Sequence, residues 1–261
     1  MVPVGELGWD GGRNVRDLGG LPVRGGGTTR PGALIRSADL DELTPAGLDA
    51  VRNLRPARLI DLRSGHETVS AHPLAGEPFF RSLPFVDPDR DRERRRGAER
   101  TKADLYTGSL DRNGARIADI ALEVAEAPPG PVIVHCKAGA DRTGMLCALF
   151  LEVAGVEPAA IIADYAATSR LDGNPSAPSA DPSSLRPARQ PATADTMTAV
   201  LAHLTSRYGG AVPYLRQHGV TAAHLDSIRH RLIRSDTLAR RIRTPQGDGR
   251  PIRPVRHPSR F

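Results

Sequence analysis

The sequence of 261 residues is poor in cysteine, aromatic residues, lysine and long apolar segments. Its two cysteines, eleven residues apart, are too few for a disulfide framework or a cysteine-based metal cluster. No stretch approaches 18 consecutive apolar residues, so no membrane-spanning helix is predicted. The N-terminus lacks the basic segment and the apolar run of a signal peptide. We therefore expect a cytoplasmic protein, with export without a leader left open.

Basic residues outnumber acidic ones by 36 to 30, and only two of the 36 are lysines, Lys102 and Lys137. The excess is unevenly distributed. The last 33 residues carry ten arginines against two aspartates, a charge of +8, so the other 228 residues carry −2. Four prolines interrupt this arginine-rich segment. We predict a folded domain over residues 1–243, a solvated basic tail over residues 244–261, and no nucleic-acid partner.

The most informative stretch is residues 131–151. The β-branched run over residues 132–134 predicts a buried strand, and the apolar run over residues 145–151 predicts a buried helix. The loop between them begins at Cys136 and ends at Arg142, and we call residues 136–142 the cradle loop. Backbone N–H groups of such a loop, together with the helix N-terminus, can surround an anion.

The residue types of the cradle loop suit attack on a phosphate ester. A thiol at a helix N-terminus beside an arginine is favoured as thiolate, its nucleophilic form. Arg142 offers a planar fork that matches two phosphate oxygens. Gly139 permits a backbone conformation that a Cβ would obstruct. The predicted substrate-binding residues are Lys137, Ala138, Gly139, Ala140, Asp141 and Arg142.

This arrangement resembles the signature of the cysteine-dependent protein tyrosine phosphatase superfamily. Other motifs are similar to landmarks of its atypical bacterial tyrosine/serine phosphatase branch, the tyrosine phosphatase B type, whose members also act on phosphoinositides. The resemblance extends from about Asn14 to Leu232. These motifs lie at residues 14–20, 35–37, 61–64, 83–87 and 164–165.

The resemblance implies an α/β fold, with a central, mostly parallel sheet flanked by helices and the active loop between a central strand and a buried helix. It also implies a phosphomonoester hydrolase that works through a phosphocysteine intermediate, in the manner of a tyrosine or dual-specificity phosphatase. The expected substrate is a phosphorylated protein, lipid or small molecule. No cofactor and no metal are expected, because the arginine and the loop amides neutralise the phosphate charge.

Two other functions remain open at this stage. One is a biosynthetic phosphatase for a small phosphorylated metabolite, such as a sugar phosphate or a nucleotide. The other is an inactive phosphopeptide-binding module, which the intact pair of Cys136 and Arg142 disfavours. The oligomeric state is not predicted.

The proton donor for the leaving oxygen has three candidates. Asp87 follows the strand predicted before residue 87, where tyrosine phosphatases place a mobile loop that carries the general acid. Asp141 lies inside the cradle loop, where it could protonate the leaving group or hold Arg142. Asp61, at the end of another predicted strand, is expected to be structural. The sequence favours Asp87 over Asp141, and Asp141 over Asp61, without deciding between them.

Three further residues have expected roles around the thiol. His135 is expected to orient the cradle loop by hydrogen bonding rather than to titrate in catalysis. Thr143 is expected to donate its hydroxyl to the sulfur. Lys137 would contact a second anionic group of the substrate or would face solvent. Ala140 stands where related loops often carry lysine, which weakens any inference of phosphoinositide specificity.

The rest of the chain gives weaker signals. Residues 87–104 form a dense mixed-charge run and are predicted to be a solvated loop, apart from Asp87. Residues 172–192, rich in Pro, Ser and Ala, are predicted to be a flexible insertion near the site. Other predicted elements are strands over 32–40, 58–64 and 79–85, a helix beginning at Pro45 with Thr44 as N-cap, a helix that ends near 169, and helices over 197–208 and 221–233.

Overall fold

The computed structural model describes residues 5–67, 71–93, 99–171 and 191–234. The predicted flexible insertion lies outside these ranges except for residues 191 and 192, and the predicted tail over 244–261 lies wholly outside them. The domain boundaries drawn from those two segments stay a prediction. Within the described ranges, no helix is both long enough and apolar enough to cross a membrane.

Six short strands of the described residues form one mixed sheet in the order β1-β2-β3-β6-β4-β5. β3, β6, β4 and β5 run parallel, whereas β1 and β2 pair antiparallel at one edge. β6, the strand that leads into the cradle loop, lies between β3 and β4 and is therefore central, as predicted. The strands are β1 (Gly5–Glu6), β2 (Arg16–Asp17), β3 (Leu34–Ser37), β4 (Arg58–Asp61), β5 (Phe80–Ser82) and β6 (Val132–His135).

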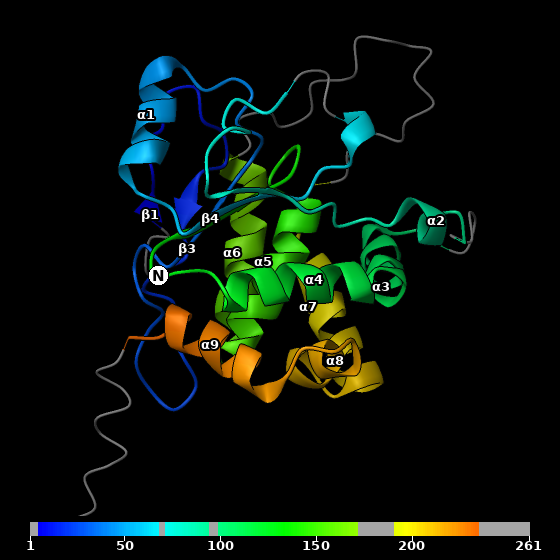
Figure 1. Ribbon diagram of the computed structural model, residues 1–261. Coiled ribbons are helices and arrows are strands. Elements are labelled where there is room, and N and C mark those ends of the chain that lie inside the picture. The colour runs from blue at the N-terminus through cyan, green and yellow to red at the C-terminus, as the bar shows by residue number, and fades with distance from the viewer. Residues whose placement is uncertain (1–4, 68–70, 94–98, 172–190, 235–261) are drawn as a thin grey trace, which may run out of the picture.

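Helices cover both faces of this sheet, with α1 on one side and most of the others gathered on the opposite side (Figure 1). The helices are α1 (Pro45–Asn53), α2 (Pro88–Asp91), α3 (Lys102–Arg112), α4 (Gly114–Ala125), α5 (Asp141–Val153), α6 (Pro158–Leu171), α7 (Ala194–His203), α8 (Ala211–Gln217) and α9 (Ala222–Leu232). A 3₁₀ turn, η1 (Gly65–Glu67), follows β4, and a π-helical turn, η2 (Leu204–Tyr208), extends α7.

The alternation of side chains along the central strands separates two hydrophobic clusters. Ile35, Leu59 and Ile133 are neighbours in the strand register and pack with Val51 of α1 on one face. The next residue along β6, Val134, faces the larger helical layer. Because both faces are buried, β6 is apolar at its first three positions, as parallel strands usually are, and the central strands carry polar residues at their carboxyl ends, such as Asp61 and His135. The α/β architecture expected from the sequence is confirmed.

Helix α5 begins inside the cradle loop and runs through the core. Ten of its 13 residues are buried, so it is a core helix rather than an amphipathic surface helix. Cys147 is fully buried in it and carries a free thiol, as expected for a small core side chain. The predicted sequence of strand, loop and buried helix is confirmed.

Local start signals explain where the structure differs from the sequence prediction. Residues 87–104 are not a simple loop, because α2 forms within them and α3 begins at Lys102. The carboxylate of Asp87 caps the first turn of α2, and Thr101 with Asp104 forms a reciprocal capping box for α3. The side chain of Thr44 caps α1 by accepting a hydrogen bond from the N–H of Gly47, as predicted. Helix capping thus allows helices to form over residues 87–104 despite the high density of charged residues there.

The sequence reading also omits α4 and α8. Neither helix has a side-chain hydrogen bond at its N-cap, although Asn113 at the start of α4 is a residue type that often caps helices. Burial of six residues of α4 against the core supplies the stabilisation instead.

Candidate active site

The cradle loop lies at the carboxyl end of β6. The backbone N–H groups of residues 137–143 have no hydrogen-bond acceptor among the described residues. Three of these groups belong to the first turn of α5, where any helix leaves unpaired donors. The other four come from the loop itself, where buried amides are normally paired. This run of donors at the start of a 13-residue helix forms a site for an oxyanion.

Cys136 lies at the base of this run of donors, buried and unoxidised. The loop then passes very close to the end of β3 at Gly139. Gly139 has a φ of +64°, and a Cβ there would lie 2.3 Å from the carbonyl oxygen of Ser37. A glycine is therefore required, both for the left-handed backbone and for the close approach.

Arg142 is held by a bidentate pair with Glu67 of η1. Its Nη1 donates to Oε2 of Glu67 at 2.5 Å, and its Nη2 donates to Oε1 at 2.7 Å. Burial alone would lower the pKa of Arg142, but the hydrogen bonds with Glu67 raise it. The pair leaves Nε–H and the second N–H of Nη2 for an anion, while Nη1 also approaches the Leu62 carbonyl oxygen at 3.5 Å. Glu67 is not among the residues predicted from sequence.

The carboxylate of Asp141 contacts two side chains that lie one turn apart on α3. Its Oδ1 accepts a hydrogen bond from the Tyr106 hydroxyl and lies 3.1 Å from Nζ of Lys102. The Tyr106 hydroxyl also lies 2.8 Å from that of Tyr165. Burial and then the charge of Asp141 raise the pKa of Tyr106 well above its ordinary value, so its phenol remains a donor. Lys102 and Tyr106 thus hold the Asp141 carboxylate toward α3.

Asp87 lies on a segment that reaches the same side of the loop as Arg142. The N–H of Phe85 donates to the carbonyl oxygen of Leu62 at 3.1 Å, and Nη1 of Arg142 approaches that oxygen at 3.5 Å. Asp87 follows two residues later, within about 7 Å along the chain. Its Oδ1 accepts from two N–H groups of the α2 region, and its Oδ2 lies 3.7 Å from Nε of Arg116.

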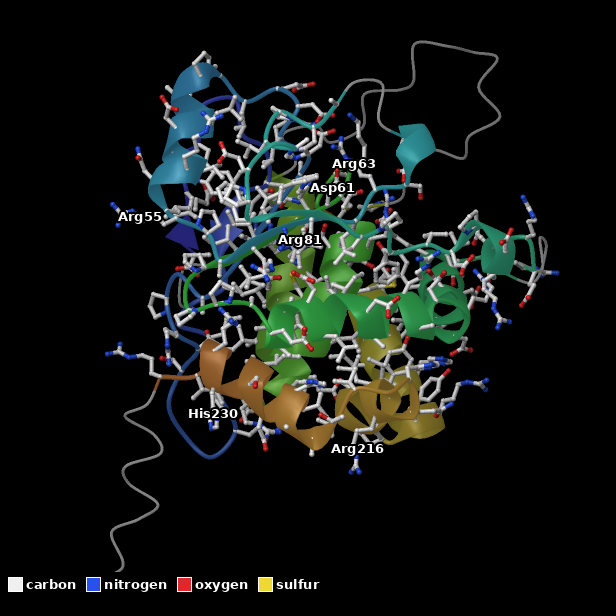
Figure 2. The ribbon with its side chains drawn as sticks, viewed as in Figure 1. Arg55, Asp61, Arg63, Arg81, Arg216 and His230 are labelled. Atoms are coloured by element: carbon white, nitrogen blue, oxygen red, sulfur yellow. The ribbon has the colours of Figure 1, made fainter. Side chains whose placement is uncertain are left out.

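Behind Cys136, the side chains of Asp61, His72 and His135 meet, with their potential ligand atoms within 4.8 Å of one another. Both Asp61 oxygens already accept hydrogen bonds from Arg63, at 2.9 to 3.1 Å. Figure 2 shows these two side chains together, at the end of the molecule opposite Arg216 and His230. Nδ1 of His72 accepts the N–H of Leu74 at 3.0 Å, which places its proton on Nε2. The Asp61 carboxylate is thus engaged by Arg63, whereas Nε2 of His72 and both ring nitrogens of His135 make no hydrogen bond within the described residues.

His135 is a neutral, packed ring. Burial lowers the pKa of His135 against the opposing attraction of Asp61, whose Oδ1 lies 3.8 Å from its Nδ1. The centroids of the His135 and His72 rings are 5.1 Å apart, and burial lowers the pKa of His72 to about 4. Neither ring nitrogen of His135 makes a hydrogen bond within the described residues, and its expected role in orienting the loop by hydrogen bonding stays a prediction.

Lys137 and Thr143 differ in their partners. The ammonium of Lys137 pairs with the buried carboxylate of Asp39, and the N–H of Asp39 donates to the Lys137 carbonyl oxygen at 3.2 Å. Lys137 thus ties the loop to the segment after β3. Thr143 is buried, and its hydroxyl makes no hydrogen bond within the described part of the chain. The expected donation from Thr143 to the sulfur of Cys136 stays a prediction.

Two side chains bind the loop from the sheet side. Nδ2 of Asn14 donates to the Ala138 carbonyl oxygen at 2.9 Å, and Nη2 of Arg36 donates to the Gly139 carbonyl oxygen at 2.6 Å. The backbone of Ala140, also buried, then leads into α5. The sequence motifs at residues 14–20 and 35–37 include these two side chains, but the sequence alone assigns them no role.

Comparison with known proteins agrees with this geometry. The profile described as tyrosine phosphatase family matches residues 7–234. A tyrosine-protein phosphatase of Nostoc commune is 32% identical over 225 residues, which cover 77% of this chain and 74% of that protein. The triple specificity protein phosphatase PtpB of Mycobacterium tuberculosis is 32% identical over 167 residues, which cover 52% of this chain and 60% of that protein.

The family match extends over most of the chain, from before β2 to the end of α9. It therefore includes the sheet apart from β1, the cradle loop and the elements that hold Arg142 and Asp141. The chain belongs to the tyrosine phosphatase family, and it is a phosphatase that acts on phosphorylated substrates.

Proposed function

We propose that Cys136 is the nucleophile of this phosphatase and forms a phosphocysteine intermediate. The observation that carries the proposal is the run of unpaired N–H donors at residues 137–143, with the thiol at its base and the Arg142 guanidinium at its end. These donors and Arg142 are oriented before the reaction, which is the arrangement that best stabilises charge on transferring oxygens.

In the first step, the thiolate of Cys136 attacks phosphorus as the bond to the leaving oxygen breaks. Negative charge on the three equatorial oxygens is stabilised by the loop N–H groups and by the N–H groups of Arg142 that Glu67 does not use. Glu67 fixes the plane of the guanidinium, so the fork is aligned when the substrate arrives.

We assign Asp87 as the proton donor to the leaving oxygen. A general acid must come within hydrogen-bond reach of the leaving oxygen, and Oδ1 of Asp141 already accepts a hydrogen bond from Tyr106 and lies 3.1 Å from Nζ of Lys102. Asp87 lies on the side of the loop where Arg142 lies, through the shared contact at Leu62. Asp141 is the alternative donor, and the variants in the Discussion distinguish the two.

In the second step, water attacks the phosphocysteine, and the carboxylate left by the first step accepts the proton of that water. The thiolate then departs from phosphorus. The hydroxyl of Thr143, unpaired among the described residues, would donate to the departing sulfur and favour its release. His135 acts through the loop, as a positioning residue.

The substrate class rests on weaker support. The name of the relative from Mycobacterium tuberculosis describes that protein as having triple specificity, which favours a broad range of phosphate esters here as well. The free thiols of Cys136 and Cys147 suit a reducing compartment, so we propose a cytoplasmic location. Phosphoprotein, lipid phosphate and small metabolite remain three separate arms of the substrate test.

The test is hydrolysis of p-nitrophenyl phosphate in the presence of a metal chelator. Wild-type protein should turn over this substrate, and Cys136→Ser should be inactive while it still binds inorganic phosphate. Cys147→Ser is the matched control and should retain wild-type rates. A panel of phosphopeptides, phosphoinositides, sugar phosphates and nucleotides, compared by kcat/KM, then identifies the class. Turnover by Cys136→Ser at the wild-type rate would contradict the proposal.

A further inference from the structure

A buried ion cluster lies directly beneath the cradle loop. Asp164 of α6 bridges two arginines, with Oδ1 2.7 Å from Nε of Arg16 and Oδ2 2.6 Å from Nη1 of Arg36. Both arginine side chains are fully buried and Asp164 is 2% exposed. Thr168, one turn further along α6, accepts from Nη2 of Arg16 at 2.9 Å. The cluster therefore joins β2, β3 and α6 at one point.

The cluster ends on two carbonyl groups of the loop. Arg36 donates to the Gly139 carbonyl oxygen, and Arg16 donates to Oδ1 of Asn14, whose Nδ2 donates to the Ala138 carbonyl oxygen. Asn14 itself is buried and has a φ of +54°. Asn14 thus combines an uncommon positive φ with a side-chain amide whose oxygen and nitrogen both make hydrogen bonds.

Pinning these carbonyl groups determines where the N–H groups point. The C=O and the N–H of one planar trans peptide point in opposite directions. When the carbonyl groups of Ala138 and Gly139 are held toward the sheet, the N–H groups of Gly139 and Ala140 must point away from it. Neither of these N–H groups has an acceptor within the described part of the chain.

The cluster also carries a net positive charge. It contains two guanidinium groups and one carboxylate. Burial and the nearby charge of Arg36 lower the pKa of Arg16 to about 10, so it remains charged near pH 7. Burial opposes the charge on Arg36, but Asp164 helps to keep the pKa of Arg36 above its ordinary value, and a thiolate at Cys136 would raise it further. Because this attraction is mutual, Arg36 also favours an anion in the cradle.

We propose that Asn14, Arg36 and Asp164 are positioning residues that set the oxyanion-binding shape of the cradle loop, by holding the Ala138 and Gly139 carbonyl groups toward the sheet. The proposal rests on the phosphatase function proposed above. It assigns a role to three sequence motifs, at residues 14–20, 35–37 and 164–165, that the chemistry of Cys136 and Arg142 leaves unexplained.

The test measures inhibition of p-nitrophenyl phosphate hydrolysis by inorganic phosphate. Asn14→Asp keeps an acceptor for Arg16 but replaces the donor to Ala138 with an oxygen. Asn14→Gly removes the amide and still allows the positive φ. Each variant should raise the phosphate inhibition constant at least about tenfold, the effect of losing one hydrogen bond to a charged ligand, and should lower kcat/KM.

Thr168→Val is the matched control. It removes a buried hydroxyl from the same cluster, but it leaves Asp164 and both loop carbonyl bonds in place. It should lower the thermal unfolding midpoint as much as the Asn14 variants, and keep the phosphate inhibition constant within about twofold of wild type. This control separates a change in loop shape from a general loss of stability.

The outcomes distinguish the two proposals. If wild type hydrolyses the substrate and Asn14→Gly keeps the wild-type inhibition constant, the positioning role is wrong and the phosphatase mechanism stands. The positioning role is also wrong if Thr168→Val raises the constant as much as Asn14→Gly does. If wild type neither turns over the substrate nor binds phosphate, the proposed function itself fails.

Discussion

The two sides of the cradle loop are held by different kinds of ion pair. On the sheet side, the charged groups are fully buried, or nearly so, and reach the loop only through its carbonyl groups. On the solvent side, every pair has a member that water reaches. The solvent-side pairs are Lys137–Asp39, Arg142–Glu67 and Lys102–Asp141.

This difference in burial suggests different roles for the two sides of the cradle loop. A buried pair that loses one partner leaves an uncompensated charge in a medium of low dielectric, so its geometry is strongly enforced. A partly exposed pair gains little free energy, and water or a substrate anion can replace either partner. The sheet side therefore fixes the shape of the anion site, while the solvent side can adjust to different phosphate esters.

The largest effect is expected when the buried side is broken. Asp164→Ala leaves two arginines without their shared carboxylate, and it should lower the free energy of unfolding by about 3–5 kcal/mol. Urea unfolding followed by circular dichroism measures this. Glu67→Gln is the solvent-side counterpart and should change the same quantity by less than about 1 kcal/mol. Equal losses in the two variants would remove the distinction between the two sides.

A buried histidine, His72, makes the free energy of unfolding depend on pH. His72 has an ordinary pKa of 6.5, which burial lowers to about 4 in the folded state. Between these values the unfolded chain binds a proton that the folded chain does not. The free energy of unfolding is therefore unaffected by this proton above pH 6.5. It falls by on the order of 3 kcal/mol as the pH drops from 6.5 toward 4.

His72→Phe should remove this part of the pH dependence while it keeps an aromatic ring against Phe80 and His135. Urea unfolding at pH 7 and at pH 4.5 measures the change. The difference in unfolding free energy between the two pH values should be smaller in His72→Phe than in wild type. An unchanged difference would show that His72 is not held neutral by burial.

The solvent side is expected to supply the proton. Asp87→Asn should lower kcat by about 100-fold on phenyl phosphate, whose leaving group needs protonation, and much less on p-nitrophenyl phosphate. The limb of the kcat–pH profile that depends on a protonated acid should flatten. Asp141→Asn should lower kcat by less than about tenfold on both substrates. The reverse ranking of the two variants would transfer the role to Asp141.

The smallest effect is expected at Lys137. Lys137→Met removes an exposed charge from Asp39, which keeps Arg13 as a partner at 3.1 Å. The free energy of unfolding should change by less than about 1 kcal/mol. If urea unfolding showed a loss of about 3 kcal/mol or more in the free energy of unfolding, Lys137 would behave like the buried ion pairs of the sheet side instead. Comparison of KM for singly and doubly phosphorylated substrates would show whether Lys137 also contacts a second anion.

The central part of the fold was predictable because its signals are local. The β-branched run before Cys136, the apolar run after Arg142 and the Thr44-Pro45 cap each specify a structure within a few residues. The structure places the predicted strand and helix on either side of the cradle loop, as expected. Helix α3 was missed, although its Thr101 and Asp104 capping box is also a local signal.

The supports of the site were not predictable in the same way. Glu67 lies 75 residues from Arg142, and Asp164 lies 128 residues from Arg36. Only the packing of β3, β4 and α6 around β6 brings these groups together. Glu67 also lies in a short turn with no distinctive pattern, so the sequence offers no signal for its pairing. The chemical roles of individual residues such as Cys136 and Arg142 could be inferred from the sequence. The partners that orient these residues could be identified only from the fold.

The most direct test of the mechanism is acid quenching of the enzyme during turnover of p-nitrophenyl phosphate, followed by peptide mass spectrometry. The mechanism predicts one added phosphoryl group on the peptide that contains Cys136, assigned to that residue and absent from Cys136→Ser, with Cys147 unmodified. Steady hydrolysis with the phosphoryl group on another residue, or undiminished turnover by Cys136→Ser, would contradict it.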